Sequence, residues 1–355
     1  MFGIIGSIRR RQDRSFQTRL KEQILEQAAV YAQVKNGDLS MVRYEKSYEK
    51  GNGTFDKNYI GRKRLSHYLL YEKIDDEKVI EILFEEELKD RQTNSFQGIG
   101  SSLQILTFLL QRYNKTGKYS GLFEKAKNAN FDCACGYDEN EIVDDSLDSL
   151  DITDCIYLSY ELQYMDTMEQ LITEWEAGVK KWTDNERKKL TRFNSLLGKN
   201  NRNEEQYIRL LESAKKNGKC FDIVSAYNEI IELYISEGQF ESAYSYMRDM
   251  IDTTDYKEIQ MIRLFQSVLE ECFEIICGLS DTPVDLWEWA KSYLLMMDKK
   301  QKFGNLYEKS IAAAKCCGDE IAEALEKEYA EWKEEVKFHW GNRGNRGRFY
   351  VPYKD

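Results

Sequence analysis

The residues of this chain whose types and spacing could support chemistry begin with two cysteines in a short acidic segment. Cys133 and Cys135 stand in the sequence Asp-Cys-Ala-Cys-Gly-Tyr-Asp, with one residue between them. Structural zinc takes four ligands, usually from two closely spaced pairs, and no second pair follows here. Acidic neighbours also raise the pKa of a thiol and oppose thiolate reactivity. The pattern therefore favours a buried or turn-forming role for both cysteines over a metal or redox site.

Neither the histidines nor the glycine-rich segment of the chain completes a catalytic pattern. His67 and His339 lie outside any H-E-x-x-H sequence or nucleophile elbow, so we expect structural or surface roles. Residues 98–103 (Gly-Ile-Gly-Ser-Ser-Leu) begin like a phosphate-binding fingerprint. A leucine replaces the third glycine, however, and no strand precedes the segment. The simplest interpretation is the start of a helix capped by Ser101 or Ser102.

The placement of charge is the most informative feature of the chain. With 51 Lys and Arg against 62 Asp and Glu, the net charge is −11. Residues 128–179 contain fourteen acidic residues and no Lys, Arg or His, so this segment carries −14 and the rest of the chain +3. Such a block repels itself unless cations or a basic partner balance it. The negative balance also argues against general nucleic-acid binding, which needs a cationic surface.

This acidic block is predicted to be a docking surface for a cationic protein, because complementary charge speeds encounter and selects partners. One alternative is a solvated face, or a face matched by the chain's own basic ends. A calcium site is another, but the aspartates lack the D-x-[DN]-x-[DN]-G spacing of a calcium loop. The residues predicted to contact the partner are Asp138, Glu139, Glu141, Asp144, Asp145, Asp148, Asp151 and Asp154.

Both ends of the chain are basic. Arg9, Arg10 and Arg11 lie near the start, and residues 341–350 form a glycine-spaced tail with arginines and two aromatic residues. Such an arm could bind nucleic acid or a partner and become ordered on contact. The simpler interpretation is a frayed terminus that lies on the protein's own acidic surface. Three arginines beside one short apolar run would bind membranes only weakly.

No segment has the features of a membrane span or a secretory signal. The most apolar run, residues 103–110, is far shorter than the roughly 20 residues that a spanning helix needs. A secretory signal places positive charge before its apolar run, and residues 1–11 have the reverse order. The 8 cysteines follow no disulfide framework of a small secreted domain. We therefore expect a cytoplasmic protein without stable membrane insertion.

The elements that must position these residues are predicted to be helices. Only 2 of the 355 residues are proline, which argues against a loop-rich β-sandwich. From about residue 184 onward, apolar residues recur at i, i+3 and i+4. Glycine readily adopts the left-handed conformation that ends a helix, so regularly spaced glycines predict a helix end about every 20 residues. Helices of this length predict antiparallel hairpins stacked as an α-solenoid. The glycines that mark this spacing stand at positions 178, 198, 218, 238, 278 and 318.

Residues 224–255 resemble a tetratricopeptide repeat. Its aromatic, aliphatic, glycine and small positions are matched by Tyr227, Ile230, Tyr234, Gly238, Phe240 and Ala243. Residues 103–122 show a weaker similarity, Asp255 replaces the closing proline, and no copy recurs at 34 residues. The resemblance implies a scaffold that binds peptides or proteins in a concave groove and performs no catalysis. The predicted groove residues are Tyr227, Tyr234, Phe240 and Trp287.

The N-terminal part is less regular. Residues 15–34 are predicted to form one amphipathic helix, and residues 37–61 a polar loop in which 40–44 could pair locally. The complete prediction is an all-α fold: a right-handed, tetratricopeptide-like α-solenoid of antiparallel helical hairpins with a less regular helical N-terminal part. Further helices are expected near 58–73, 75–90 and 99–115. The predicted divisions are an irregular helical region (1–130), an acidic helical segment (131–182), the repeat region (183–340) and a basic flexible tail (341–355).

The sequence thus predicts a non-enzymatic helical-repeat protein that binds a basic protein or peptide and uses no cofactor or metal. Its most concrete form is an acidic antagonist, such as the immunity protein of a nuclease-type toxin, because enzymes that cleave nucleic acid present cationic sites. One alternative is a regulator whose groove senses a short peptide. Another is an enzyme with a dispersed N-terminal site, which a deep pocket near Cys133, His67 or Gly98 would support.

Overall fold

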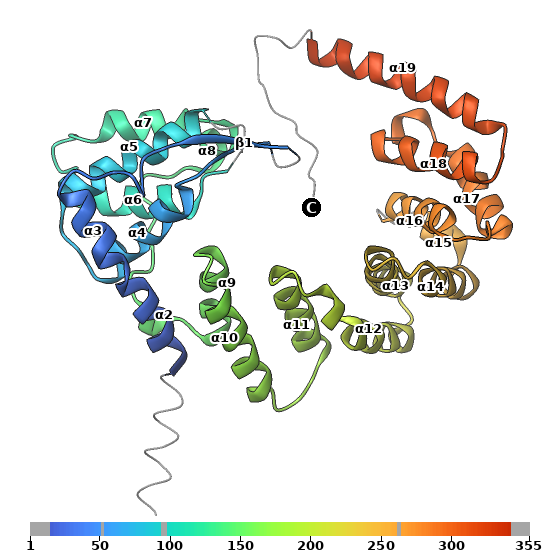
Figure 1. The fold of residues 1–355 in the computed structure, drawn as a ribbon, viewed down its shortest axis with the longest axis horizontal. Helices are drawn as coiled ribbons and strands as arrows, with labels where there is room; N and C mark the ends of the chain where they lie inside the picture. Colours follow the sequence, from blue (N-terminus) through green and yellow to red (C-terminus); the bar gives the residue numbers. More distant parts are fainter. Residues whose placement is uncertain (1–14, 51–52, 94–97, 261–263, 342–355) are drawn as a thin grey trace, which may run out of the picture. The chain divides into compact units, whose positions relative to one another are not determined.

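A computed structural model of the chain describes residues 15–50, 53–93, 98–260 and 264–341 (Figure 1). These residues are mostly helical, with one two-stranded sheet, so the all-α prediction is confirmed. None of their helices is long and apolar enough to cross a membrane. Arg9, Arg10 and Arg11 near the start of the chain, and the tail from residue 342, lie outside the described residues. The described residues form two compact units, the first ending at Gly178 and the second beginning at Val179.

The first unit contains short helices and one β-hairpin. Within it, α2 and α3 both contact α4, α5 packs on α6, and α9 packs on α10. Helices predicted near 58–73, 75–90 and 99–115 are present as α4, α5 and α6. The elements are α2 (Ser15–Leu25), α3 (Gln27–Lys35), β1 (Lys46–Glu49), β2 (Gly53–Asp56), α4 (Tyr59–Tyr71), α5 (Glu77–Thr93), α6 (Ser101–Gln111), α7 (Ser120–Lys127), α8 (Phe131–Gly136), η1 (Leu147–Ser149), α9 (Ile152–Glu161) and α10 (Met165–Gly178).

The first predicted helix is two helices in the structure. The helix expected over 15–34 is interrupted at Glu26, although no glycine or proline stands there. The two halves have different neighbours, because α2 also contacts α9 and α10, whereas α3 contacts α5. Tertiary packing accounts for this break, and tertiary packing overrides local helix propensity.

The polar stretch after α3 contains a β-hairpin. Its strands are antiparallel, with Lys46 opposite Asp56. The local pairing expected at 40–44 is wrong, because those residues precede β1 and include a turn in which Val42 N donates to Leu39 O. Strands of four residues offer too little alternation to be recognised from sequence.

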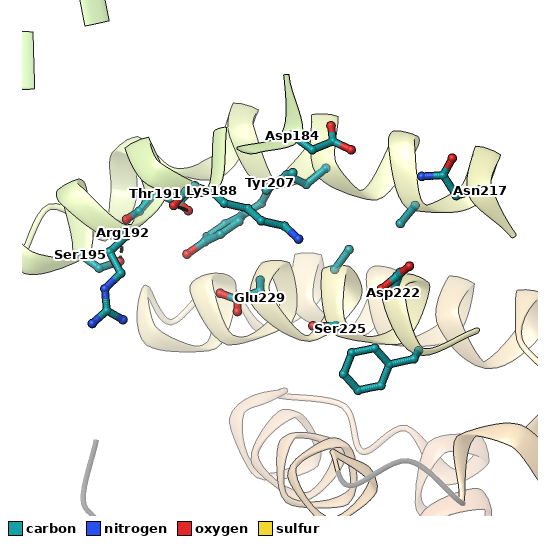
Figure 2. Close-up of a pocket in the computed structure, with 14 residues that line it drawn as sticks. Asp184, Lys188, Thr191, Arg192, Ser195, Tyr207, Asn217, Asp222, Ser225 and Glu229 are labelled. Atoms are coloured by element: carbon teal, nitrogen blue, oxygen red, sulfur yellow. Dashed lines mark hydrogen bonds between the residues drawn. The ribbon is translucent and has the colours of Figure 1, made fainter. Parts of the chain in front are cut away.

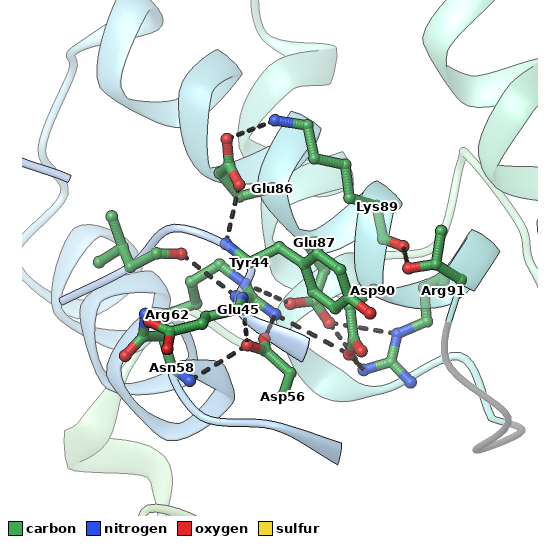
Figure 3. Close-up of polar contacts among 12 residues, drawn as sticks. Tyr44, Glu45, Asp56, Asn58, Arg62, Glu86, Glu87, Lys89, Asp90 and Arg91 are labelled. Atoms are coloured by element: carbon green, nitrogen blue, oxygen red, sulfur yellow. Dashed lines mark hydrogen bonds and ion pairs between the residues drawn. The ribbon is translucent and has the colours of Figure 1, made fainter. Parts of the chain in front are cut away.

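A network of buried charges connects the hairpin to α4 and α5 (Figure 3). Arg62 is fully buried, and its guanidinium lies 2.9 Å from Glu87 and 2.5 Å from Asp56. Arg91 is 2% exposed and lies 2.9 Å from Glu87 and 3.2 Å from Asp90. A planar guanidinium can bond two carboxylates at once, so two arginines are enough for three buried acids. The network therefore fixes the hairpin against two helices by directional contacts.

The second unit is built from helices that pack in chain order. Helix α11 packs on α12, α12 on α13 and α13 on α14; α16 contacts α13, α14, α17 and α18, and α19 packs on α18. The elements are α11 (Asp184–Leu196), η2 (Asn200–Arg202), α12 (Glu204–Asn217), α13 (Cys220–Ser236), α14 (Phe240–Thr253), α15 (Tyr256–Ile259), α16 (Phe265–Gly278), α17 (Val284–Met296), η3 (Lys299–Gln301), α18 (Gly304–Cys316) and α19 (Ile321–Gly341).

Four of the six regularly spaced glycines have the predicted left-handed backbone. Gly178 and Gly278 do not, because they are the last residues of α10 and α16. At Gly278 the absence of a side chain serves packing, since a Cβ there would lie 2.3 Å from the ring of Phe240. The four with φ between 62° and 70° are Gly198, Gly218, Gly238 and Gly318.

Apolar packing dominates the interior of the second unit. Its core includes Val224, Ile230 and Ile231 of α13, each fully buried. Buried tyrosines direct their hydroxyls toward carboxylates of a neighbouring helix, as Tyr307 of α18 does with Glu328 of α19 at 2.8 Å. Buried amides of this unit also bond each other, as Asn194 Nδ2 does with Asn203 Oδ1 at 2.9 Å.

Candidate functional site

The acidic surface, defined here as residues 138–154, begins as an irregular segment between α8 and α9. Its first half is bound to α6, where Gln111 Nε2 donates to the carbonyl of Glu139 at 2.9 Å. About two turns earlier on the same helix, Gln104 Nε2 donates to the carboxylate of Glu141 at 2.8 Å. The other face of α6 is apolar and buried. The amphipathic pattern of α6 therefore positions this half of the acidic surface.

The second half of the acidic surface is fixed by its own aspartates. Asp144 accepts hydrogen bonds from Ser146 N at 3.0 Å and from Ser149 Oγ at 2.6 Å. Asp151 and Asp154 form a capping box in which each carboxylate accepts a bond from the other's backbone N–H. Carboxylates at a helix N-terminus accept hydrogen bonds from the free backbone N–H groups there and interact favourably with the helix dipole. These three predicted partner-binding residues therefore have structural roles.

The other five predicted residues differ in how far they are paired. Asp145 lies 3.8 Å from Lys73 Nζ and 3.9 Å from Arg112 Nη2, which is loose ion pairing. The remaining four are exposed and make no ion pair with any described residue: Asp138, Glu139, Glu141 and Asp148. The acidic surface thus combines an ordered backbone with four exposed carboxylates that no cation of the described chain neutralises, although Glu141 accepts a bond from Gln104 and Asp138 one from Asn140 N.

Ile142 lies within this acidic surface and is 87% exposed. It directly follows Glu141, one of the four acidic residues that make no ion pair with a described residue. Interface hot spots have this arrangement, with an apolar anchor at the centre and polar residues at the rim. The geometry suits docking onto a basic surface that offers an apolar pocket. Among the described residues, no group of three or more His, Cys, Asp and Glu is arranged to hold a metal ion.

Of the residues that the sequence singled out for chemistry, the structure brings Cys133 next to the glycine segment, with Cys133 Sγ 3.9 Å from the carbonyl of Gly98. Cys133 is buried, which raises the pKa of its thiol, whereas Cys135 is exposed. His67 is 3% exposed, and burial lowers its pKa. Its Nδ1 lies 2.9 Å from the carbonyl of Lys63 in the same helix. His339 is part of α19, and its side chain is outside the described residues.

The predicted serine cap of α6 is wrong. The helix begins at Ser101 after Gly100, and no side chain caps it. Ser101 Oγ instead donates to the carboxylate of Glu161, at the end of α9. Lys63 Nζ lies 3.5 Å from the same carboxylate. A charged acceptor makes a stronger hydrogen bond than a neutral one, and this competes with the capping role.

The aromatic residues predicted to line a repeat groove lie mainly inside the second unit. Tyr227, Tyr234 and Trp287 are 0%, 6% and 2% exposed. Phe240 is half-buried and packs over Gly278. Trp287 also contributes to a small hollow beside the start of α17. These side chains hold helices together, and the larger pocket of the unit is lined by other residues.

That pocket has a volume of about 650 Å³ and lies between α11, α12 and α13 (Figure 2). Lys188 and Arg192 project from α11 on one side. Asp222 and Glu229 project from α13 on the other, and Tyr207 of α12 lies between them. The α11 wall of the pocket is therefore mainly basic, with Asp184 at the start of the helix, and the α13 wall is acidic. Such a pocket can bind a segment that carries charges of both signs.

This pocket cannot be recognised from the sequence, because its lining is polar and periodic. Residues 184, 188, 192 and 195 fall on one face of α11, as 222, 225 and 229 do on α13. Polar residues at helical spacing usually form a solvated face, and only the tertiary fold makes the two faces oppose each other. Burial and Glu229 raise the pKa of Tyr207 to about 12, so this hydroxyl stays protonated.

Two surfaces of the described chain therefore have the geometry of binding sites. The acidic surface offers one sign of charge around an exposed apolar side chain, and the pocket offers both signs. The comparisons with known proteins add no relative to this description: no family model, no curated protein and no solved structure matches the chain.

Proposed function

We propose that this chain is a non-enzymatic helical-repeat protein that binds a basic protein partner through its acidic surface. The observation that carries the proposal is the set of four exposed carboxylates that make no ion pair within the described chain, beside the 87% exposed Ile142. Repulsion among such carboxylates costs stability until a cationic surface meets them. In its most concrete form the partner is an enzyme that cleaves nucleic acid, and the acidic surface covers its cationic site as an antagonist.

The ordered backbone of the acidic surface supports this proposal. Gln104 and Gln111 hold its first half, and the capping box of Asp151 and Asp154 holds its end. Binding therefore orders little chain, which lowers the entropic cost of association. The exposed carboxylates raise the association rate with a basic partner. Burial of Ile142 in the interface lowers the dissociation rate.

We also propose that residues 183–340 form a right-handed, tetratricopeptide-like α-solenoid. Helices that pack in chain order support the arrangement, as do left-handed glycines 20 residues apart at Gly198, Gly218 and Gly238. Stacked helical hairpins present an extended concave surface that can hold a partner.

The test is affinity purification from the source cells with full-length protein, at about 50 mM and about 200 mM salt. The test variant carries D138N, E139Q, E141Q and D148N. The control carries E22Q, E26Q, E85Q and E124Q, which remove the same charge from exposed positions outside the acidic surface. We expect a basic partner that wild type and control retain, and that is lost in the test variant and at higher salt.

Two results would count against the proposal. One is a set of partners that are neutral or acidic, and the other is a basic partner that the test variant retains as well as wild type. With the purified partner, Ile142→Ala should speed dissociation about tenfold, which equals about 1.4 kcal/mol. An unchanged dissociation rate would remove Ile142 from the interface.

The pocket of the second unit supports a second function, the binding of a short peptide as a regulatory signal. Its opposed walls suit a peptide with both basic and acidic side chains. Peptide fractions that raise the melting temperature of wild type should fail to do so for Lys188→Met combined with Glu229→Gln. The control is Lys216→Met, an exposed lysine of α12 outside the pocket. A shift that survives the pocket variant would exclude this site.

A further inference from the structure

Two exposed cysteines of the second unit lie side by side. Cys277 is near the end of α16, and Cys316 is the last residue of α18. Their sulfur atoms are 3.7 Å apart, although the residues are 39 positions apart in the chain. The contact follows from the packing of α16 against α18. At 3.7 Å the two sulfur atoms are in contact but not bonded, so both residues are free thiols.

This pair differs from the other cysteines of the chain. Cys133, Cys155 and Cys272 are buried, and Cys135 is exposed in the first unit without a sulfur contact in the described structure. Cys317 follows Cys316 directly, but neighbouring residues on a helix point in different directions. A disulfide needs a sulfur–sulfur distance of about 2.05 Å. A disulfide between Cys277 and Cys316 therefore requires the two sulfur atoms to move together from 3.7 Å to this distance.

We propose that Cys277 and Cys316 form a redox-active dithiol site that a peroxide oxidises to a disulfide between α16 and α18. The site is independent of the proposed partner binding, since both cysteines belong to the second unit and the acidic surface belongs to the first. Both sulfur atoms are accessible to a small oxidant because both residues are exposed.

The reaction has two steps that balance. The thiolate of Cys316 attacks one oxygen of hydrogen peroxide, the O–O bond breaks, and the products are a sulfenic acid at Cys316 and one water after proton transfer. The Cys277 sulfur then attacks the sulfenic sulfur, forms the S–S bond and releases a second water. Two thiols lose two electrons and two protons in total, and one peroxide is reduced to two waters.

The order of the two cysteines is part of the proposal. Partial burial of the Cys277 thiol and the adjacent Cys316 raise the pKa of Cys277 to about 12, which favours its neutral form. In the proposed order Cys316 makes the first attack, and Cys277 resolves the sulfenic acid. Because resolution requires loss of the Cys277 proton, the rate of disulfide formation should rise from pH 7 to pH 9.

The disulfide should stabilise the second unit. It closes a loop that contains all of α17, and such a cross-link reduces the entropy of the unfolded chain. For a loop of this length we expect the melting temperature to rise by about 5 °C or more.

The experiment treats full-length protein with hydrogen peroxide at pH 7, 8 and 9 and maps unreduced peptides by mass spectrometry. We expect a linked peptide that joins Cys277 to Cys316, the loss of two titratable thiols, a higher melting temperature, and reversal of all three by dithiothreitol. Cys277→Ser and Cys316→Ser should each abolish the linked peptide and the shift. Cys135→Ser, which removes another exposed cysteine, should keep both.

Other products would overturn the proposal. Oxidation that ends in sulfinic acid at Cys316, or in links between molecules, would show that Cys277 does not resolve the sulfenic acid. A Cys316–Cys317 disulfide as the main product would show that the neighbouring helix takes no part. A linked Cys277–Cys316 peptide without a rise in melting temperature would remove the inferred effect on stability.

Discussion

The two units bury acidic side chains in opposite ways. In the first unit, Glu87 and Asp90 are at most 2% exposed, and each lies within 3.2 Å of the Arg91 guanidinium. Arg62 adds a second contact to Glu87 at 2.9 Å. In the second unit, Glu271 is 8% exposed, and its Oε2 has no hydrogen-bond partner in the described structure. The same kind of side chain is paired in one interior and orphaned in the other.

The charges around Glu271 explain its state. From α13, Glu229 and Glu232 act on it, and from its own helix Glu274 does. The one cation that acts on it, Lys309 of α18, is ion-paired with Glu274. Burial first, and then these acidic neighbours, raise the pKa of Glu271 well above its usual value. Burial and these acidic neighbours therefore favour the neutral form of Glu271 over the ionised form.

The difference shows that burial alone does not decide the charge of an acid. A buried carboxylate stays ionised when cations and hydrogen-bond donors replace its lost hydration, and it takes up a proton when they do not. Arg62 supplies that replacement with a rigid guanidinium whose own burial is outweighed by Glu87 and Asp56, so its pKa lies above the usual value. The first unit thus holds Glu87 and Asp90 by directional charge contacts in addition to the apolar core that both units have.

The largest expected effect comes from breaking the charge network with Arg62→Met. The change leaves Asp56 without its 2.5 Å partner and Glu87 with only Arg91. Removing one partner of a buried ion pair costs about 3–5 kcal/mol, because the remaining charge stays buried. Urea unfolding should show this loss, and hydrogen exchange should locate it in the hairpin and in α4 and α5.

The matched control for this prediction is Arg43→Met, which removes an exposed arginine of the same unit. It should change stability by less than about 0.5 kcal/mol. A loss near that size for Arg62→Met would mean that the network contributes little. Lost protection in α13 or α16 would mean that the two units do not differ in the way described.

A smaller effect is expected from Asp319→Asn in the second unit, where a carboxylate at the edge of the apolar core is fully paired. Asp319 accepts bonds from Lys291 Nζ at 2.5 Å, Ile321 N at 3.0 Å and Trp287 Nε1 at 2.9 Å. The Lys291 bond, followed by the Ile321 N–H, lowers the pKa of Asp319 to about 2. The variant should lose about 1–2 kcal/mol at pH 7.

The sign of its pH dependence follows from the lowered pKa. The stabilisation by Asp319 is present above its unfolded pKa near 4 and disappears as pH falls toward 2. Denaturant unfolding at pH 7 and pH 3 should therefore give a smaller difference between variant and wild type at pH 3. A difference that stays constant would show that the charge of Asp319 is not the cause.

The sequence predicted those features that depend on neighbours along the chain. Helical periodicity, the −14 segment and the left-handed Gly198, Gly218 and Gly238 all follow from residues within one or two turns. The break at Glu26 was not predicted, because it depends on which helices lie beside α2 and α3. Local patterns carry no information about such neighbours.

The candidate site shows the same division. Its acidic composition was evident, but sequence could not distinguish Asp144, which closes a turn, from Asp148, which is exposed and unpaired. The pocket depends on Lys188 of α11 facing Glu229 of α13, two residues 41 positions apart. The resemblance to a repeat placed Tyr227 in a groove, whereas its fully buried side chain packs in the core.

The smallest effect is expected from Glu271→Gln, and it is recognised by how the stability of the variant changes with pH. Because the folded pKa of Glu271 is raised, the unfolded chain ionises first as pH rises above about 4.5, and the folded state loses stability from there up to the folded pKa. Glutamine has the same shape and does not ionise, so the variant avoids this loss. It should be about as stable as wild type near pH 4 and more stable by about 1 kcal/mol at pH 8.

Chemical denaturation at pH 4, 6 and 8 measures this trend, with the exposed Glu323→Gln as control. The control should differ from wild type by the same small amount at every pH, because its carboxyl is exposed to solvent. If Glu271→Gln behaves like this control, Glu271 is ionised in the folded state and has found a cation. The contrast between a paired and an orphaned buried acid would then be lost, since both units would bury carboxylates in the same way.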